Sequence, residues 1–474
     1  MIYQVSDRPG VSKTVVFAIQ QLLAIMAATL VVPIIIGNGM SPAAALFGAG
    51  VGTLVYLLFT KFKSPVFLGS SFAFLSSMAA AFAGGVSVGL GYLGLIFGAI
   101  FGGLVYVIIA IIVKFAGTAW INKLMPAVVI GPTVAIIGLS LAGNAVGDLQ
   151  KGDVMKDVVS YVVNTDGLIP VIEEQVSSVS TANPLIAILC GLVTLFTVIL
   201  CSTFGKKMAK LIPFIIGIGA GYVVAAIFTV IGIVAESPEL QIINFAYFTD
   251  LFKDGVKLSS FLAVPGFTFI KAFGAFGELS GEYVAAIAVA YVPVAFVVFA
   301  EHIADHKNIS SIIEKDLLTE PGLSRTLLGD GVGSMAGALF GGCPNTTYGE
   351  SVACVAITRN ASVITIFFAS IGAILISFLA PFVALVDSIP SCVMGGVCIA
   401  LYGFIAVSGL KMIRDIDLGQ NKNLFVVSTI LICGIGGLAI NIGAVTITAI
   451  AVALILGIIV NLLLKDAKPE TTEE

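Results

Sequence analysis

The amino-acid sequence predicts an all-α polytopic membrane protein whose fourteen transmembrane segments form two inverted repeats of seven. Three observations support this fold class: charged residues are scarce, apolar segments follow one another along the whole chain, and short motifs recur in its two halves. Only 11% of the 474 residues are charged, 58% are hydrophobic, and the mean hydropathy is +1.11. Soluble domains carry roughly 25% charged residues, so this chain cannot cover a water-facing surface.

The apolar segments have the length that a bilayer requires, since a helix needs about 20 mainly apolar residues to cross it. The ninth and tenth segments are shorter and rich in glycine. The predicted segments are 14–36, 42–60, 65–84, 88–113, 125–147, 183–202, 211–235, 283–303, 326–342, 344–358, 361–385, 390–410, 423–441 and 443–464.

The basic residues predict the orientation of these segments, because loops on the cytoplasmic side are enriched in Lys and Arg. With the N-terminus in the cytoplasm, 18 of the 23 basic residues lie on that side. The other five lie in two long outer loops, 148–182 and 236–282, where the rule is weakest. Both termini are therefore predicted to be cytoplasmic.

The acidic residues point to a site. Of the 27 acids, only Glu301 and Glu350 are predicted to lie within apolar segments, and the others are assigned to loops, tails or segment edges. A carboxylate at membrane depth is costly unless it is paired, solvated or protonated, so it marks a functional site by default. For Glu350 the alternative is an ordinary hydrogen bond between helices, and for Glu301 it is a place at the membrane surface.

Two pairs of motifs relate the halves of the chain. Residues 70–73 (Ser-Ser-Phe-Ala) match 346–349 (Thr-Thr-Tyr-Gly), and each match follows a proline. A Pro-x-x-Val-x-Gly pattern at 126–131 recurs at 390–395. Seven segments separate the members of each pair, and because seven is odd, the two halves have opposite topology.

Interrupted segments at matching positions are the best sequence sign of a transporter site. Backbone groups freed by a break are tolerated at membrane depth only where protein or a cavity satisfies them, and a polar ligand can complete them at a helix N-terminus. We therefore expect residues 68–73 and 345–350 to meet at a binding site. The alternative is that their small residues merely let helices pack closely.

Other classes of function find no support in the sequence. The net charge of −4 provides no basic surface for nucleic acid, and the seven cysteines show no metal-binding spacing. No nucleotide-binding loop motif occurs, and the apolar segments hold no cluster of catalytic or metal-ligating residues. The protein is therefore not expected to be an enzyme, to bind a metal or a cofactor, or to have a nucleic acid partner.

Several stretches resemble the nucleobase–ascorbate transporter family, and within it the bacterial uracil:proton symporters. They are 68–74 (Leu-Gly-Ser-Ser-Phe-Ala-Phe), 300–303 (Ala-Glu-His-Ile), 315–318 (Lys-Asp-Leu-Leu), 344–350 (Pro-Asn-Thr-Thr-Tyr-Gly-Glu) and 393–396 (Val-Met-Gly-Gly). The resemblance extends over nearly the whole chain. It implies a homodimer in the bacterial cytoplasmic membrane, with lipid around it.

The resemblance also implies two domains. A core domain would comprise residues 1–115 (segments 1–4) and 241–386 (segments 8–11). A gate domain would comprise 116–240 (segments 5–7) and 387–474 (segments 12–14 and a cytoplasmic tail). The third and tenth segments would each contain a short strand followed by a half-helix.

The family motifs imply a set of substrate-binding residues. Two glutamates would accept hydrogen bonds from a nucleobase ring, two backbone N–H groups would donate to a ring carbonyl, and two tyrosines would line the pocket from the core and from the gate. These residues are Glu301 and Glu350, Phe72 and Gly349, and Tyr348 and Tyr402, respectively. Tyr402 also suits a purely packing or interfacial role.

The proton-coupling residues follow from the same resemblance. Asp305 stands where related uracil transporters have histidine, and His306 follows it. Asp305 lies four residues after Glu301, on the same helix face. The hypothesis is that Glu301 exchanges a proton during transport and that Asp305 or His306 tunes it, whereas His302 is expected to be structural.

The sequence assigns no single role to three further positions. Ser351 departs from the family signature, which usually has asparagine after the tenth-segment glutamate. Gln20 and Gln21 lie within the first segment, the repeat partner of the eighth. They either support the site or form an ordinary hydrogen bond between helices.

The function that the resemblance implies is proton-coupled import of uracil by alternating access, with the proton as coupling ion. One alternative is a permease for xanthine, urate or another purine, which only the shape of the pocket would distinguish. A less favoured alternative is an anion exchanger of similar fold. That function needs a cationic site, and no Lys or Arg lies within a predicted segment.

Overall fold

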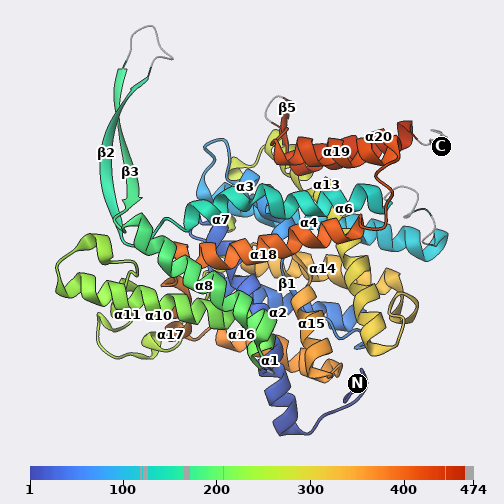
Figure 1. The fold of residues 1–474 in the computed structure, drawn as a ribbon, viewed down its shortest axis with the longest axis horizontal. Coiled ribbons are helices and arrows are strands. Elements are labelled where there is room, and N and C mark those ends of the chain that lie inside the picture. Colours follow the sequence, from blue (N-terminus) through green and yellow to red (C-terminus); the bar gives the residue numbers. More distant parts are fainter. Residues whose placement is uncertain (118–119, 121–125, 165–170, 207, 443–444, 465–474) are drawn as a thin grey trace. The chain divides into compact units, whose positions relative to one another are not determined.

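The computed structural model describes residues 1–117, 120, 126–164, 171–206, 208–442 and 445–464, and Figure 1 shows the path of the chain. The chain forms two compact units. Unit 1 comprises Met1–Leu141, Phe261–Val383 and Leu401–Glu474, and unit 2 comprises Ala142–Ser260 and Ala384–Ala400.

Unit 1 is built from long helices with two pairs of short strands between them. Its helices are α1 (Val11–Ile36), α2 (Pro42–Phe59), η1 (Phe72–Phe74), α3 (Leu75–Ala81), α4 (Val88–Ala116), α6 (Ala127–Ser140), α12 (Thr268–Ala272), η5 (Phe273–Glu278), α13 (Gly281–Ile313), η6 (Leu318–Gly322), α14 (Leu323–Gly341), α15 (Gly349–Thr358), α16 (Val363–Ile376), α19 (Asn421–Ile435) and α20 (Ala449–Leu463). Its strands are β1 (Leu68–Ser70), β4 (Asn345–Thr347), β5 (Ile440–Ile442) and β6 (Val445–Ile447).

Unit 2 contains two long helices, several short ones and a β-hairpin. Its elements are α7 (Ala142–Asp148), β2 (Met155–Asn164), β3 (Val171–Ser180), α8 (Pro184–Phe204), α9 (Met208–Leu211), α10 (Pro213–Val234), η2 (Pro238–Leu240), α11 (Ala246–Thr249), η3 (Asp250–Phe252) and η4 (Leu258–Ser260). The helices α17 (Ala380–Asp387) and α18 (Ser391–Met412) each have residues in both units.

The helices begin where the sequence offers a cap or a proline. Ser41, Ser87 and Ser280 accept a backbone N–H at the starts of α2, α4 and α13, and Asn183 does so at α8. Proline in the first turn of α2, α8 and α10 costs no hydrogen bond, because that N–H has no partner within the helix.

Glycine lets α14 approach two neighbouring helices closely. A Cβ on Gly48 of α2 would lie 2.3 Å from the carbonyl oxygen of Gly337, and one on Gly103 of α4 would lie 2.6 Å from that of Gly331. Backbones in such contact leave no room for a side chain. These glycines of α14 therefore provide close packing between helices.

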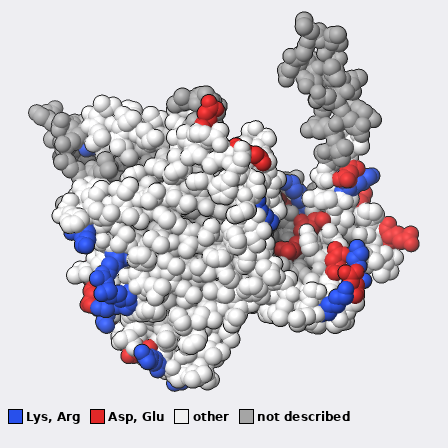
Figure 2. Space-filling view, turned by 180° about the vertical axis from the view of Figure 1, so that it is seen from behind, with Lys and Arg blue, Asp and Glu red and all other residues white. Residues whose placement is uncertain are grey.

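Eight described helices are long and apolar enough to cross a membrane, and five shorter apolar helices accompany them. The face in Figure 2 accordingly has broad areas without charged side chains. The predicted count of fourteen segments and their relation as inverted repeats remain predictions.

Several predicted boundaries differ from the structure. The eighth segment, predicted to end at residue 303, continues as α13 to Ile313. The eleventh, 361–385, is divided into α16 and α17. Between them Leu379 pairs with Leu262 in a β-bridge, which satisfies backbone groups that a continuous helix would have used itself.

The outer loop 148–182 contains the β-hairpin of β2 and β3 (Figure 1). Ten residue pairs extend from Met155↔Ser180 to Asn164↔Val171. The sequence carries a signal for it, since both strands are rich in valine, a residue that is enriched in β-strands. Treating 148–182 only as a loop missed this element.

The division into two units does not follow the predicted core and gate. Unit 1 includes α6, α19 and α20, which were assigned to the gate domain. The units reflect packing in one conformation, whereas core and gate would be parts that move during transport. The boundaries 1–115, 116–240, 241–386 and 387–474 therefore stay a prediction.

Candidate functional site at the paired strands

The strands β1 and β4 pair with each other in antiparallel orientation within unit 1. The paired residues are Leu68↔Thr347, Gly69↔Thr346 and Ser70↔Asn345. The pairing continues on both sides, because Ser71 N donates to Pro344 O (2.9 Å) and Tyr348 N donates to Phe67 O (3.2 Å). The prediction that residues 68–73 and 345–350 meet is confirmed.

Side chains from α2 hold β1 in place. The Leu68 N–H donates to Thr53 Oγ1 over 3.0 Å, and this hydroxyl is itself bonded to the carbonyl of Ala49. On the other strand, Asn345 Nδ2 donates to Gly48 O over 3.0 Å. These groups are buried, so the outward N–H of Leu68 in β1 is satisfied inside the protein, and the side chain of Asn345 connects β4 to α2.

Tyr348 braces the two strands. Its hydroxyl donates to Ser70 O over 2.7 Å, and its ring occupies the space above Gly69, where a Cβ would lie only 2.4 Å from ring carbons. Tyr348 is 5% exposed. Position 69 therefore needs glycine, and the ring of the predicted pocket residue Tyr348 lies against strand β1.

Each strand leads directly into the start of a helix, η1 at Phe72 and α15 at Gly349. Neither preceding residue, Ser71 or Tyr348, supplies a side-chain cap. The first N–H groups of a helix have no acceptor within it, and they carry a positive partial charge. The two predicted backbone donors thus lie at two helix starts that strand pairing brings together.

Carboxylates gather at the start of α15. Asp305 on α13 accepts a hydrogen bond of 2.8 Å from Thr347 Oγ1, and a Cβ on Gly349 would lie 4.0 Å from Asp305 Oδ1. Glu301, one turn earlier, interacts electrostatically with Asp305 and with Glu350 in the first turn of α15. The structure therefore brings four of the predicted residues together: Glu301, Asp305, Gly349 and Glu350.

The start of η1 has apolar surroundings instead. Tyr402 of α18 packs edge to face against Phe72, with ring centroids 6.0 Å apart and an interplanar angle of 77°. Tyr402 is 3% exposed. The predicted placement of Tyr402 beside this part of the site thus agrees with the contact that the structure contains.

Helix α1 contacts the candidate site through a hydrogen bond to α15. Gln21 Nε2 donates to Ser351 Oγ, and the same oxygen accepts the Phe67 N–H over 3.0 Å. Ser351 thus connects α15 with α1 and with the residue before β1. This contact is a hydrogen bond between helices, and it fits both roles considered for Gln21; it also gives Ser351, which departs from the family signature, a structural task.

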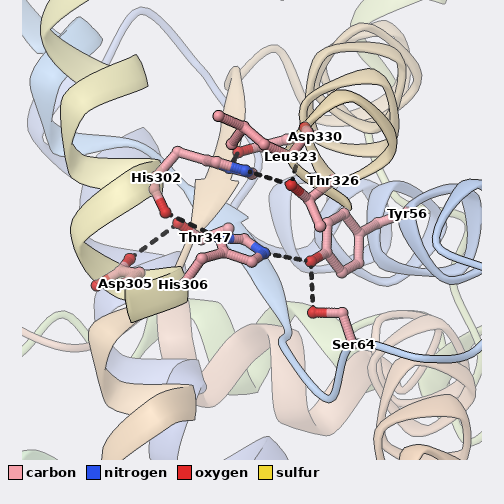
Figure 3. Close-up of polar contacts among 9 residues, drawn as sticks. All are labelled: Tyr56, Ser64, His302, Asp305, His306, Leu323, Thr326, Asp330 and Thr347. Atoms are coloured by element: carbon pink, nitrogen blue, oxygen red, sulfur yellow. Dashed lines mark hydrogen bonds and ion pairs between the residues drawn. The ribbon is translucent and has the colours of Figure 1, made fainter. Parts of the chain in front are cut away.

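Sequence reasoning missed Asp330. It was assigned to a segment edge, but the structure places it in α14 with a fully buried side chain. His302 Nδ1 lies 2.6 Å from Asp330 Oδ2, and His302 Nε2 lies 3.0 Å from Thr326 Oγ1 (Figure 3). A lone Asp within a glycine-rich helix, with a lone His in a neighbouring apolar segment, was the available signal.

His306 and Asp305 point to different sides of α13. Asp305 faces Thr347, whereas His306 faces Tyr56 of α2, with 2.7 Å between His306 Nε2 and the Tyr56 hydroxyl (Figure 3). Of the three predicted proton-coupling residues, Glu301 and Asp305 therefore lie together, and His306 belongs to a separate buried network. Within the described residues, no group of three or more His, Cys, Asp or Glu side chains suits a metal ion.

The chain matches the permease family over residues 12–172 and 158–443. It is 37% identical to a uracil permease of Bacillus caldolyticus, over 100% of this chain and 96% of the relative. It is 38% identical to a uracil permease of Bacillus subtilis (99% and 96%) and 35% identical to one of Escherichia coli K12 (97% and 93%).

Two solved structures share the fold. The transmembrane domain of the cyanobacterial bicarbonate transporter BicA gives a TM-score of 0.60 at 12% identity, over 97% of this chain and 100% of that one. The murine Slc26a9 anion transporter gives 0.59 at 10% identity, over 97% and 69%. The full-length relatives decide the family: the chain is a multi-pass membrane protein that belongs to the permease family, the nucleobase–ascorbate transporters that its motifs resemble.

Proposed function

We propose that the protein imports uracil together with a proton by alternating access. The observation that carries the proposal is the meeting of two helix starts with a group of carboxylates at β1 and β4, in a chain whose full-length relatives are uracil permeases. Uracil presents two N–H donors and two carbonyl acceptors on one flat ring. The proposed site offers the complementary groups.

The hydrogen bonds divide between side chains and backbone. Glu301 and Glu350 accept from the ring N–H groups, and such charge-assisted bonds are about twice as strong as neutral ones. The N–H groups of Phe72 and Gly349 donate to ring carbonyls, favoured by the positive ends of the helices. Tyr348 and Tyr402 supply ring surface, which a flat ligand requires from a mostly apolar site.

The carboxylates supply the proton coupling in this proposal. Glu301, Asp305 and Glu350 repel one another when all are charged, and a proton bound to the group relieves that repulsion. A proton and a neutral nucleobase can therefore load the same site together. Glu301 exchanges the proton, with Asp305 as its neighbour on α13.

The remaining features of the proposal concern the whole assembly. A homodimer lies in the bacterial cytoplasmic membrane with both termini in the cytoplasm. The core domain (1–115 and 241–386) carries the substrate, and the gate domain (116–240 and 387–474) provides the surface against which it moves. The proton is the coupling ion, and no cofactor takes part.

A neutral ligand suits the site better than an anion. In the described part of the chain, the contacts of Glu301, Asp305 and Glu350 given above involve no Lys or Arg, whereas an anion site needs cations. Lys307, which α13 carries beyond the predicted segment end, and Arg325 near the start of α14 are both exposed. The likeness to two anion transporters concerns the fold alone. A purine remains the alternative substrate.

The test is uptake of labelled uracil into proteoliposomes, with and without an inward proton gradient. We expect accumulation only with the gradient, inhibition by excess unlabelled uracil, and little inhibition by xanthine. Glu301→Gln should abolish accumulation, because glutamine cannot exchange the proton. Uptake that ignores the gradient, or that xanthine suppresses as strongly as uracil does, contradicts the proposal.

A further inference from the structure

A buried row of hydrogen bonds lies behind the substrate site and has no part in binding the nucleobase. The Tyr56 hydroxyl lies 2.7 Å from His306 Nε2 and 2.7 Å from Ser64 Oγ, and His306 Nδ1 lies 2.8 Å from the carbonyl oxygen of His302 (Figure 3). Tyr56, Ser64 and His306 are all 0% exposed. These three buried side chains are hydrogen-bonded in series without contact to water. Which atom donates in one bond therefore determines which atom donates in the next.

The carbonyl partner fixes that order. A carbonyl oxygen only accepts, so His306 Nδ1 carries a hydrogen in every state. When His306 is neutral, Nε2 is therefore an acceptor, and the Tyr56 hydroxyl donates to it. The Tyr56 oxygen can then accept from Ser64 Oγ, which reverses the direction in the structure, where the Tyr56 hydroxyl donates to Ser64 Oγ. The row is satisfied from end to end.

The row is equally satisfied when His306 carries an extra proton. Nε2–H then donates to the Tyr56 oxygen, and the Tyr56 hydroxyl donates to Ser64 Oγ. Passage to the neutral state breaks one N–H bond at His306, and it breaks and forms one O–H bond at Tyr56 and at Ser64. His306 gives the Nε2 proton to Tyr56, and Tyr56 gives its own to Ser64. Ser64 gives its own to a water molecule from the side of the exposed residues 61–63, a step for which Ser64, 0% exposed in this structure, has to become accessible. One proton leaves, and no charge remains in the row.

The neighbouring histidine lacks such an exit. The Thr326 hydroxyl donates to Leu323 O over 3.1 Å, so its oxygen accepts from His302 Nε2–H. His302 Nδ1 shares the remaining proton with Asp330 over 2.6 Å. Both ring nitrogens of His302 are therefore occupied, Nε2 by Thr326 and Nδ1 by Asp330. The two imidazole rings stack with centroids 4.0 Å apart, yet only His306 faces a chain of hydroxyls.

The ends of the row suit proton transfer. Ser64 directly follows residues 61–63, which are exposed and include Lys61 and Lys63, on the side predicted to be cytoplasmic. At the other end, His306 follows Asp305 in the chain. The titratable groups that interact electrostatically with the row are Asp305 and Asp330, at Tyr56, and His302, at His306.

We propose that Tyr56 and Ser64 carry protons between His306 and the surface at residues 61–63, on the predicted cytoplasmic side. The proposal rests on the proposed uracil:proton symport. Tyr56 and Ser64 are proton carriers here and do not touch the substrate.

The first test reads the proton order without any substrate. The chain has only two histidines, so ¹⁵N-histidine NMR of the whole protein gives two imidazole rings. We expect neutral His306 to carry its hydrogen on Nδ1, and the Nε2 signal to change in Tyr56→Phe but not in Tyr106→Phe. Tyr106 is a matched control, because its buried hydroxyl has no hydrogen-bond partner among the described residues. A neutral His306 protonated at Nε2 overturns the proposal.

The second test separates proton passage from substrate binding. Tyr56→Phe keeps the ring and removes the hydroxyl, so uracil counterflow at equal pH should stay within about twofold of the parent. Gradient-driven accumulation and uracil-induced proton flux should fall at least about tenfold, and Ser64→Ala should fall less. Tyr106→Phe should resemble the parent.

The outcomes are distinct. If Tyr56→Phe accumulates uracil like Tyr106→Phe, or if counterflow falls as much as accumulation, the row is structural and the proposal is wrong. If the parent protein does not transport uracil, the proposed function fails, and the NMR result still decides whether the row has the order required here.

Discussion

The two helix starts at the paired strands share a backbone arrangement but differ in their side chains. η1 begins with Phe72 and has the ring of Tyr402 beside it, whereas α15 begins with Gly349 and Glu350 and has Asp305 beside it. Both lack a side-chain cap. The backbone N–H groups are arranged alike at both starts, whereas an aromatic ring lies beside the first and carboxylates lie beside the second.

A third helix start, that of α18, is closed in the sense that a side chain accepts its first backbone N–H. At α18, in unit 2, Asp153 Oδ1 accepts from Ser391 N (3.1 Å) and Ser391 Oγ (3.0 Å). The first N–H of α18 is thereby occupied and serves structure alone. The starts at β1 and β4 differ from it because no side-chain cap occupies their first N–H groups.

The largest expected effect comes from removing charge at the second start. Glu350→Gln keeps the shape of the side chain but loses a charge-assisted acceptor, so uracil uptake should fall about 100-fold, which equals roughly 2.7 kcal/mol. The measurement is kcat/KM for uptake in proteoliposomes. Glu320→Gln is the control, since Glu320 forms an exposed pair with Lys63. Equal activity of both variants would refute the role of Glu350.

The next effect tests the strand pairing that unites the two starts. Gly69→Ala places a methyl group 2.4 Å from the Tyr348 ring, and such overpacking costs about 1–3 kcal/mol. The thermal midpoint of unfolding should decrease, and uptake should fall with it. Gly219→Ala in α10, where a Cβ meets nothing within 4 Å, should leave both unchanged. Unchanged stability of Gly69→Ala would mean that Tyr348 does not brace β1.

A smaller effect is expected at the first start. Tyr402→Ala removes the ring that packs on Phe72, and an aromatic pair contributes about 0.5–1.5 kcal/mol beyond its buried area, so KM for uracil should rise up to about tenfold. Tyr402→Phe keeps the ring and should lie between this variant and the parent. A loss in Tyr402→Phe as large as in Tyr402→Ala would show that the hydroxyl, and therefore polar recognition, acts at this start too.

The smallest effect concerns the closed start and its pH dependence. Burial, together with the charge of Asp148, raises the pKa of Asp153 to about 6 from its ordinary value of 3.8, and the bonds from Ser391 oppose this rise. The folded protein therefore holds this proton more tightly than the unfolded chain does. Stability from this group should be greatest below about pH 4 and decline as pH rises to about 6, by on the order of 1 kcal/mol for a partly exposed carboxyl.

Thermal unfolding between pH 4 and pH 8 measures this step. Asp153→Asn keeps an acceptor for Ser391 but cannot ionise, so the step should become smaller. Burial also raises the pKa of Asp387 to about 6, and this group accounts for the remainder. Asp157→Asn, at an exposed aspartate of the same unit, should retain the full step. An undiminished step in Asp153→Asn would show that Asp153 does not contribute to it.

The sequence by itself determined the membrane class, the two broken segments and the residues near them. Repeated motifs predicted that residues 68–73 and 345–350 meet, because segments related by inverted topology can approach each other at a common centre. The structure contains that pairing, with Glu301, Asp305 and Glu350 grouped around it. The family resemblance supplied the roles, and these remain proposals.

Only the tertiary structure decided how neighbouring polar residues are paired. Hydropathy averages over a window, so it hid Asp330 within a glycine-rich helix, although the partner that makes burial tolerable is His302 on another helix. Likewise Asp305 and His306 are adjacent in sequence, yet one faces the strands and the other Tyr56. Adjacent residues on a helix point about 100° apart, and which neighbour each one meets depends on packing that no local pattern contains.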